Sequence, residues 1–203
     1  MQVASQQLGR RERNKQAKLD RITAAATELF AKHGVDDVTT QQIADAADIG
    51  TGTLFLYAKT KGELLLLVQN ARYATALERG RSAAADAPDV LAGVLALVAP
   101  VVECNRTQVD NGRTYLREMV FGDPSEPHHA EALSIVGQTE AAIAATLIDR
   151  AGLDAPAAST IARVVSAIMF LEMAASVNAG SSNQEILASI RSQVAAILPS
   201  GRS

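Results

Sequence analysis

The sequence predicts an all-α protein in which a small N-terminal helix-turn-helix head joins an antiparallel helical body, with about nine helices in all. Residues that favour helices, such as alanine, leucine, glutamate and arginine, are abundant, while aromatic residues make up only 3% of the 203 residues. Apolar residues recur at the spacing of amphipathic helices, and no segment sustains a period of two. Clusters of glycine, proline and serine divide the chain into lengths that suit single helices.

Composition argues against a membrane or secreted protein. The first ten residues, MQVASQQLGR, lack the apolar core of a signal peptide. The longest uncharged apolar run, 90–102, contains Pro100 and is shorter than the roughly 20 residues that a membrane-spanning helix needs. The single cysteine, Cys104, cannot form an intrachain disulfide, and it is either an inert buried thiol or a redox-active one. We therefore expect a cytoplasmic protein.

The net charge of −3 conceals a strong asymmetry along the chain. All five lysines lie within the first 61 residues, and residues 1–21 carry six basic and two acidic side chains. Residues 62–203 carry 10 arginines, no lysine and 15 acidic side chains. A basic end on an acidic body indicates that one end meets a polyanion, although a solvated basic tail would give the same pattern.

The N-terminal region divides into an arm and a helix. Residues 1–17 are polar and basic, which predicts a flexible arm that either follows DNA phosphates or remains free. An amphipathic helix is predicted over 18–33, and Gly34 suits its C-terminal end. This helix would pack behind the segment that follows and stabilise it.

Residues 39–61 predict two short helices joined by a tight turn. Thr39 and Gln42 form a capping-box pattern at the first helix, and Ile43 and Leu54 lie on the inner faces. Two such short helices are not stable alone, so neighbours must hold them and leave their outer face free. A helix-turn-helix that places its second helix in the DNA major groove has this arrangement.

The outer face combines polar, basic and apolar side chains. Hydroxyl and amide groups can bond phosphates or base edges, and methyl groups can meet thymine. Lys59 and Lys61 are placed for phosphates. The alternative is a protein-binding patch built on the apolar members. The outward residues of the two helices are Thr40, Gln41, Thr51, Thr53, Phe55, Leu56 and Tyr57.

The segment 19–67 resembles the DNA-binding domain of tetracycline-repressor-type (TetR family) transcription regulators. The resemblance rests on AAATELFAKHG at 24–34 and VTTQQIADAADIGTGTLFLYAKTKGELL at 38–65. The rest of the chain is similar only in length and helical character. The resemblance implies a head over 18–62 and a ligand-binding and dimerisation body over 63–203.

The resemblance also implies DNA-contacting roles. It implies phosphate or sugar contacts for Thr40, Thr53, Phe55, Tyr57 and Lys61. It implies a base-reading position at Gln41, and it places the groove-facing start of the recognition helix at Thr51 and Gly52. Thr39 completes the set as the helix cap.

Four positions depart from the family pattern and put the base preference in doubt. Leu56 stands where an aromatic residue or histidine is common, so it would contact thymine methyls or nothing. Ala58 replaces a frequent phenylalanine, and Lys59 replaces a frequent proline. Asp48 takes a turn position that often holds glycine, although aspartate tolerates a left-handed conformation comparatively well.

The body is predicted to begin with a long helix from Lys61 to about Asp86, which in the family links the two domains. Five further helices follow, separated by proline and glycine turns. Their predicted spans are 89–106, 109–121, 126–151, 156–179 and 183–198.

Two of these helices predict a homodimer. The helix at 156–179 is apolar on nearly every side, and the helix at 183–198 has an apolar stripe. A monomer of this size would not cover both. A two-fold four-helix bundle would cover them, and it would set two recognition helices about one DNA turn apart on a near-palindromic operator.

An effector cavity is expected among the remaining body helices. Because polar candidates are few, namely Asn105, Arg117 and Glu118, a small and largely apolar effector is the default expectation. The candidate lining residues are Leu97, Val101, Cys104, Tyr115, Met119, Phe121, Phe170 and Met173.

No catalytic or cofactor motif is evident in the sequence. Glu126 and His129 with their neighbours His128 and Glu131 suggest a metal site, but the motif occurs once and contains Pro127, which indicates a surface helix start. The sequence thus predicts a ligand-responsive DNA-binding regulator, with a repressor favoured over an activator and no catalytic residue, metal or cofactor. The alternatives are a helical-bundle enzyme or carrier, and an adaptor protein.

Overall fold

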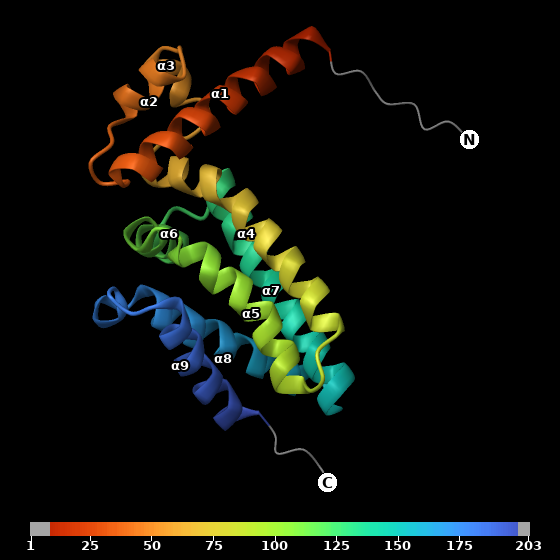
Figure 1. Cartoon of the computed structure of the whole chain (residues 1–203). Coiled ribbons are helices and arrows are strands. Elements are labelled where there is room, and N and C mark those ends of the chain that lie inside the picture. The colour runs from red at the N-terminus through yellow and green to blue at the C-terminus, as the bar shows by residue number, and fades with distance from the viewer. Residues whose placement is uncertain (1–8, 199–203) are drawn as a thin grey trace.

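A computed structural model describes residues 9–198 of the chain, and all helices and cavities below belong to this range. The head consists of α1 (Arg10–His33), α2 (Thr40–Ala46) and α3 (Thr51–Leu54). It sits at one end of the elongated body, across the start of the long helix α4 (Lys61–Ala85), as the ribbon shows (Figure 1). Within the described range the fold is all-α, as the sequence predicts.

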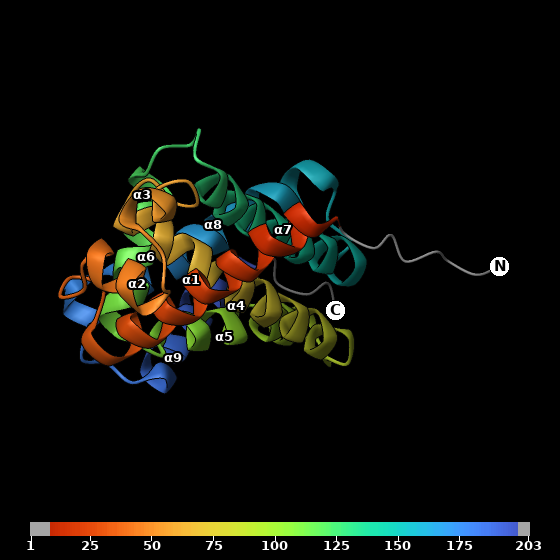
Figure 2. The ribbon, with the colours of Figure 1, turned by 90° about the horizontal axis from the view of Figure 1, so that it is seen from above.

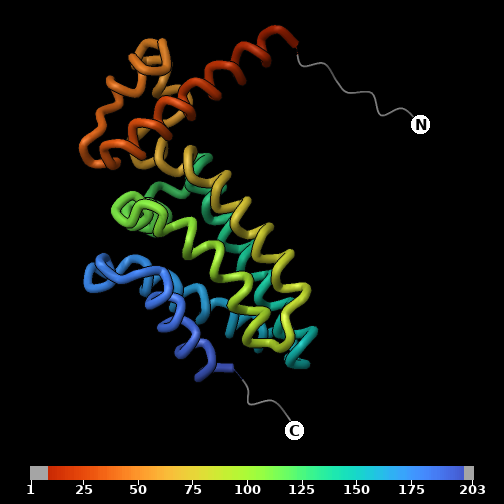
Figure 3. The backbone as a smooth tube through the Cα atoms, in the orientation of Figure 1, coloured from red at the N-terminus to blue at the C-terminus, as the bar shows by residue number. Residues whose placement is uncertain are grey.

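The body has two layers of helices. The first layer contains α4, α5 (Val90–Arg106) and α7 (Pro127–Ala151), which lie side by side in both orientations (Figures 1 and 2). The second contains α8 (Ala155–Ala174) and α9 (Asn183–Ile197), with a short 3₁₀ turn, η1 (Ser176–Asn178), between them. Helix α6 (Val109–Phe121) closes the end that faces the head (Figure 3).

Side-chain caps define several helix starts, one of which the sequence predicts. Thr39 forms the expected capping box with Gln42 at α2. Thr60, Asp89 and Asp154 each accept a backbone N–H at the start of α4, α5 and α8. A cap of this kind contributes about 1 kcal/mol, so these residues fix the boundaries locally before any packing occurs.

The flexible-arm prediction for 1–17 is wrong over residues 10–17, which form the first two turns of α1. Arginine, lysine, glutamine and glutamate favour helices, and extending an existing helix requires no new nucleus. Gln16 also donates to Asp20 one turn on, at 2.7 Å. The first part of the predicted arm, 1–8, lies outside the described residues.

Four of the five spans predicted for the later body helices agree with the structure to within one residue at each end. The span 156–179 is wrong at its C-terminal end, because α8 stops at Ala174 and Ala175 is extended. The side chain of Asn178 donates to the backbone oxygen of Glu172 at 3.0 Å, and such local bonds compete with helix continuation.

Helix α8 is long and apolar enough to cross a membrane by length and composition alone, with 28% of that span buried within the protomer. One face packs into the core through Ala162, Val165 and Met169. Another leaves Val164 at 42% and Leu171 at 63% exposure. Apolar residues on several faces of one helix indicate several packing partners, which accounts for the composition without a membrane.

Buried amide bonds join the head to the body. The Asn111 side chain accepts from the backbone N–H of Val35 at 2.8 Å and donates to the carbonyl of Phe30 at 2.9 Å. Gln108 donates to the carbonyl of Ala31 at 2.6 Å. Because α1 ends at His33, its last carbonyls need such partners, and α6 supplies them.

Helix α6 reaches the head because it turns sharply away from α5. The two helices bend by 111° at a short break. Gly112 makes this close approach possible, since a Cβ atom there would overlap the carbonyl oxygen of Asn105. The bend places Asn111 under the C-terminal end of α1.

We expect Asn111→Ala to lower the free energy of unfolding by about 1–3 kcal/mol, because it leaves the buried N–H of Val35 without a partner. Chemical denaturation measures this change. Gln138→Ala, at an exposed position on α7, serves as the control and should change stability by less than about 0.5 kcal/mol. Equal effects of the two substitutions would show that Asn111 does not hold the junction.

Candidate functional site

The turn between α2 and α3 is tied to α1. Asp48 has a φ of 53°, the left-handed conformation that the sequence required at this turn. Arg21 of α1 reaches both the Asp48 carbonyl and its carboxylate at 3.4 Å. Leu54 and Ile43 are buried beneath the turn as predicted, and their packing holds the angle between the two short helices.

Polar groups of α2 and α3 meet on the outer face. Thr51 donates to the Gln41 side-chain oxygen at 2.6 Å, and the Gln41 side-chain nitrogen donates to Asp45 at 2.7 Å. Gln41 and Gly52 are exposed, while Thr51 and the neighbouring Thr53 are half-buried. The start of α3 therefore presents a pre-ordered amide–hydroxyl pair to the outside.

The exposed residues at the end of α3 are apolar. Leu56 is 84% exposed and Phe55 is 44% exposed. Tyr57 is half-buried, and its hydroxyl donates to the carbonyl of Lys15 in α1 at 3.3 Å. Ala58 is buried, so only a small side chain fits the packing here.

The two lysines near α3 have different environments. Lys61 is half-buried, and its ammonium donates to the carbonyl of Asp36 at 3.0 Å. Lys59 instead pairs with Glu126 of the body, whose hydrogen bond and charge raise the pKa of the Lys59 ammonium. Thr40, the remaining predicted contact, is half-buried at the start of α2.

A hydrogen-bond chain links the recognition helix to the interior of the body. His128 contacts the carbonyl of Tyr57 through its ring nitrogen at 2.9 Å. The His128 carbonyl accepts from Asn70 at 2.9 Å, and Asn70 accepts from the hydroxyl of Tyr115 at 2.9 Å. Glu63 lies beside this chain, and burial raises the pKa of its carboxyl. Sequence patterns could not reveal these contacts, because their members come from the turn after α3 and from α4, α6 and α7.

An apolar cavity of about 340 Å³, which we call the body cavity, lies among α6, α7 and α8. Five of the eight residues proposed from the sequence line it, namely Val101, Tyr115, Met119, Phe170 and Met173. The other three lie elsewhere: Leu97 is buried in the core, Cys104 lies in a surface groove beside Arg72 and Arg79, and Phe121 lines a different cavity. Burial raises the pKa of the Cys104 thiol, which argues against a reactive thiolate.

The inner wall of the body cavity contains two stacked tyrosines. The rings of Tyr73 and Tyr115 lie 4.3 Å apart and nearly parallel. Burial raises the pKa of both hydroxyls, so they remain neutral hydrogen-bonding groups. Asn105 donates to the Tyr73 hydroxyl at 2.7 Å. Sequence reasoning did not include Tyr73, although its place on the buried face of the linking helix was a usable signal.

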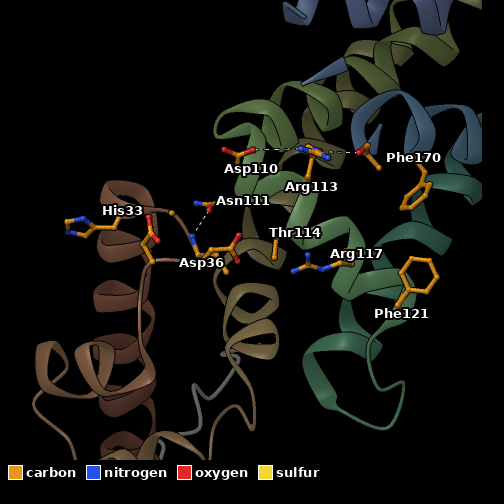
Figure 4. Close-up of a pocket in the computed structure, with 13 residues that line it drawn as sticks. His33, Asp36, Asp110, Asn111, Arg113, Thr114, Arg117, Phe121 and Phe170 are labelled. Atoms are coloured by element: carbon orange, nitrogen blue, oxygen red, sulfur yellow. Dashed lines mark hydrogen bonds and ion pairs between the residues drawn. The ribbon is translucent and has the colours of Figure 1, made fainter. Parts of the chain in front are cut away.

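A second cavity, of about 450 Å³, lies between the head and the body, and we call it the junction cavity (Figure 4). The loop after α1 forms one wall through Asp36 and Asp37. Helix α6 forms the other through Arg113 and Arg117. Figure 4 shows the Arg117 guanidinium reaching toward the head loop.

Two residues of the suspected metal motif have other partners, whereas the buried ring nitrogens of His129 have none within residues 9–198. Glu126 pairs with Lys59, and His128 contacts Tyr57. His129 is buried beside Gly122. Over residues 9–198, no group of three or more histidine, cysteine or acidic side chains could hold a metal ion.

The fold and the exposed α2–α3 unit define a DNA-binding protein of the helix-turn-helix class. Residues 22–68 match the family model described as bacterial regulatory proteins, tetR family. No curated protein matches the sequence. The head is therefore similar to the N-terminal domain of that family, and the comparisons below show that the whole chain shares the fold of TetR-family regulators.

Solved structures of TetR regulators are similar over nearly the whole chain. One from Rhodococcus sp. RHA1 is 18% identical with a TM-score of 0.68, covering 94% of this chain and 100% of that one. The repressor FadR of Thermus thermophilus, in complex with lauroyl-CoA, is 22% identical with a TM-score of 0.70, covering 91% and 97%. FadR of Bacillus halodurans, a fatty acid degradation regulator, is 16% identical with a TM-score of 0.59, covering 89% and 99%.

We expect Glu126→Gln to strengthen DNA binding, because it removes the charge that holds Lys59 and leaves the ammonium free for a phosphate. The slope of log affinity against log salt should steepen by up to about 0.9, the value for one added phosphate contact. Fluorescence anisotropy over a salt series measures both changes. Glu103→Gln, an exposed change of equal charge on α5, should alter neither quantity.

Proposed function

We propose that this protein is a ligand-responsive transcription regulator that binds a near-palindromic operator as a homodimer and is released by a small, largely apolar effector. The observation that carries the proposal is the hydrogen-bond chain between the recognition helix and the wall of the body cavity. We favour a repressor over an activator, because an effector in the body cavity would disturb the head and release it from the operator. A cytoplasmic location accords with this role.

In the proposed DNA complex, α3 enters the major groove. Gln41 and Thr51 form the base-reading pair, with Leu56 beside them for a thymine methyl group. Thr40, Thr53, Tyr57 and Lys61 contact phosphate or sugar around that pair. The first turns of α1 add further positive charge, through the exposed Arg10, Arg11, Lys15 and Lys18.

The proposed dimer forms through α8 and α9. The uncovered stripe of α8 contains Ile161, Val164, Ile168 and Leu171, at alternating spacings of three and four residues. This spacing keeps them on one side of a helix, and a second copy would bury them. Two heads held in this way would read two half-sites about one DNA turn apart.

The body cavity is the proposed effector site. Its volume of about 340 Å³ falls within the usual range for small-molecule sites, and methionine, valine and aromatic side chains dominate its wall. The lauroyl-CoA complex of the Thermus thermophilus repressor favours an acyl chain as the apolar component. An occupant that displaced Tyr115 would break its bond to Asn70, and through His128 it would loosen the contact with Tyr57.

Binding to duplex DNA from the region upstream of the protein's own gene tests the proposal. Lys61→Ala should weaken binding to all sequences and reduce the salt slope by about 0.9. Gln41→Ala should instead lose about 1–3 kcal/mol of discrimination at one base pair per half-site. Selection from a random duplex pool, followed by anisotropy, distinguishes the two effects. Absence of binding by the folded wild-type protein at low salt would refute the proposed function.

We expect Leu171→Arg to yield a monomer, because it places a charge on the most exposed residue of the proposed dimer stripe. Light scattering after gel filtration measures the mass. Operator affinity should fall at least about 100-fold, since each head would then bind alone. Leu133→Arg, which introduces the same charge at an exposed apolar residue of α7, is the matched control and should remain dimeric.

A further inference from the structure

The body cavity and the junction cavity are neighbours with a shared wall. Phe170 of α8 lines both of them. Helix α6 also borders both, because Tyr115 and Met119 face the body cavity while Arg113 and Arg117 face the junction cavity. One aromatic side chain and one helix therefore separate an apolar space from a polar one.

The two cavities differ sharply in chemistry. The body cavity is lined mainly by apolar groups, with Glu140 and Arg163 as its charged members. The junction cavity is more polar. Its charged members include Asp36, Asp37, Asp110, Arg113 and Arg117, and its two aromatic members, Phe121 and Phe170, stand on the side away from the head loop (Figure 4). A molecule that extended past Phe170 would pass directly from apolar to charged surroundings.

Arg117 is the cation best placed to meet such a molecule. Its only ion-pair contact within the described residues runs from Nε to Glu118 at 3.7 Å, which leaves the terminal nitrogens of the guanidinium open. Arg113 is less available for a ligand, because its Nε donates to the carbonyl of Ala174 at 3.1 Å. The carboxylates of Asp36 and Asp37 belong to the opposite, head-side wall.

We propose that the two cavities form one two-part site for an amphipathic anion. The aliphatic chain occupies the body cavity, and the anionic group passes Phe170 and binds beside Arg117. This inference rests on the proposed effector function. It further specifies that the effector is an anion and that its charged end binds in the junction cavity. A guanidinium binds a carboxylate or phosphate through charge-assisted, often bidentate, hydrogen bonds.

The position of the anionic group gives it a direct effect on the head. Its charge would lie between Arg117 and the exposed carboxylates of Asp36 and Asp37. Repulsion of the loop that follows α1 widens the junction. That loop also holds Lys61 through the Asp36 carbonyl, so widening disturbs a proposed phosphate contact.

Three probes of equal chain length test the assignment: decanoate, decanol and decylamine, each below its micelle-forming concentration. Isothermal titration calorimetry on the full-length protein gives the affinities, and operator release is followed separately by anisotropy. The two-part site predicts that decanoate binds at least about tenfold more tightly than decanol, and that decylamine binds most weakly. Preference for decylamine, equal affinities for all three, or no binding of any probe would overturn it.

Arg117→Gln should remove the preference for decanoate over decanol, and Arg163→Gln should leave it intact. Arg163 is the matched control, because it is the arginine that lines the body cavity. The melting temperature without ligand reports whether each variant is folded. Loss of the preference in Arg163→Gln alone would place the anion inside the body cavity and refute the two-part site. If decanol and decanoate bind equally and both release the operator, the two-part site fails while the proposed regulator function stands.

Discussion

The side chain of Asn111 provides the interaction on which the arrangement of head and body depends. It satisfies the buried N–H of Val35, which has no other partner among residues 9–198, and it adds a second hydrogen bond to the carbonyl of Phe30, which also accepts the N–H of Gly34. The head is too small to retain a fixed orientation through its own short helices. Because α6 is hydrogen-bonded to the end of α1, a movement of α6 also moves the head. Both cavities border α6.

The contacts between head and body fall into two groups with different chemistry. Asn111 and Gln108 join α6 to α1 through amide hydrogen bonds. On the opposite side, Glu126 and His128 join the start of α7 to the residues that end and follow α3. The first group fixes position, because amide hydrogen bonds are directional and those of Asn111 are buried. The second includes a charge pair with an exposed lysine, which DNA phosphates can compete for in solution.

Much of the fold could be predicted from the sequence, because it is encoded by short-range patterns. Thr39 with Gln42 marks the start of α2, proline and glycine turns separate the body helices, and Asp48 occupies the left-handed turn position. The start of α1 was misplaced because polar residues such as Arg10 extend a helix without giving an apolar stripe. The sequence did not predict the end of α8. The helix ends where Asn178 donates to the carbonyl of Glu172, and this hydrogen bond forms only when the chain turns back on itself.

The sequence by itself determined the helical class, the helix-turn-helix with its outward residues, and the apolar character of α8. These follow from helix periodicity, capping and the residue types at fixed spacing. Only the tertiary structure decided which apolar residues line the body cavity, since Leu97 and Met119 look alike in the sequence but only Met119 lines it. It alone paired Lys59 with Glu126 and set Phe170 between two cavities, because contacts between residues distant in the chain depend on how whole helices pack.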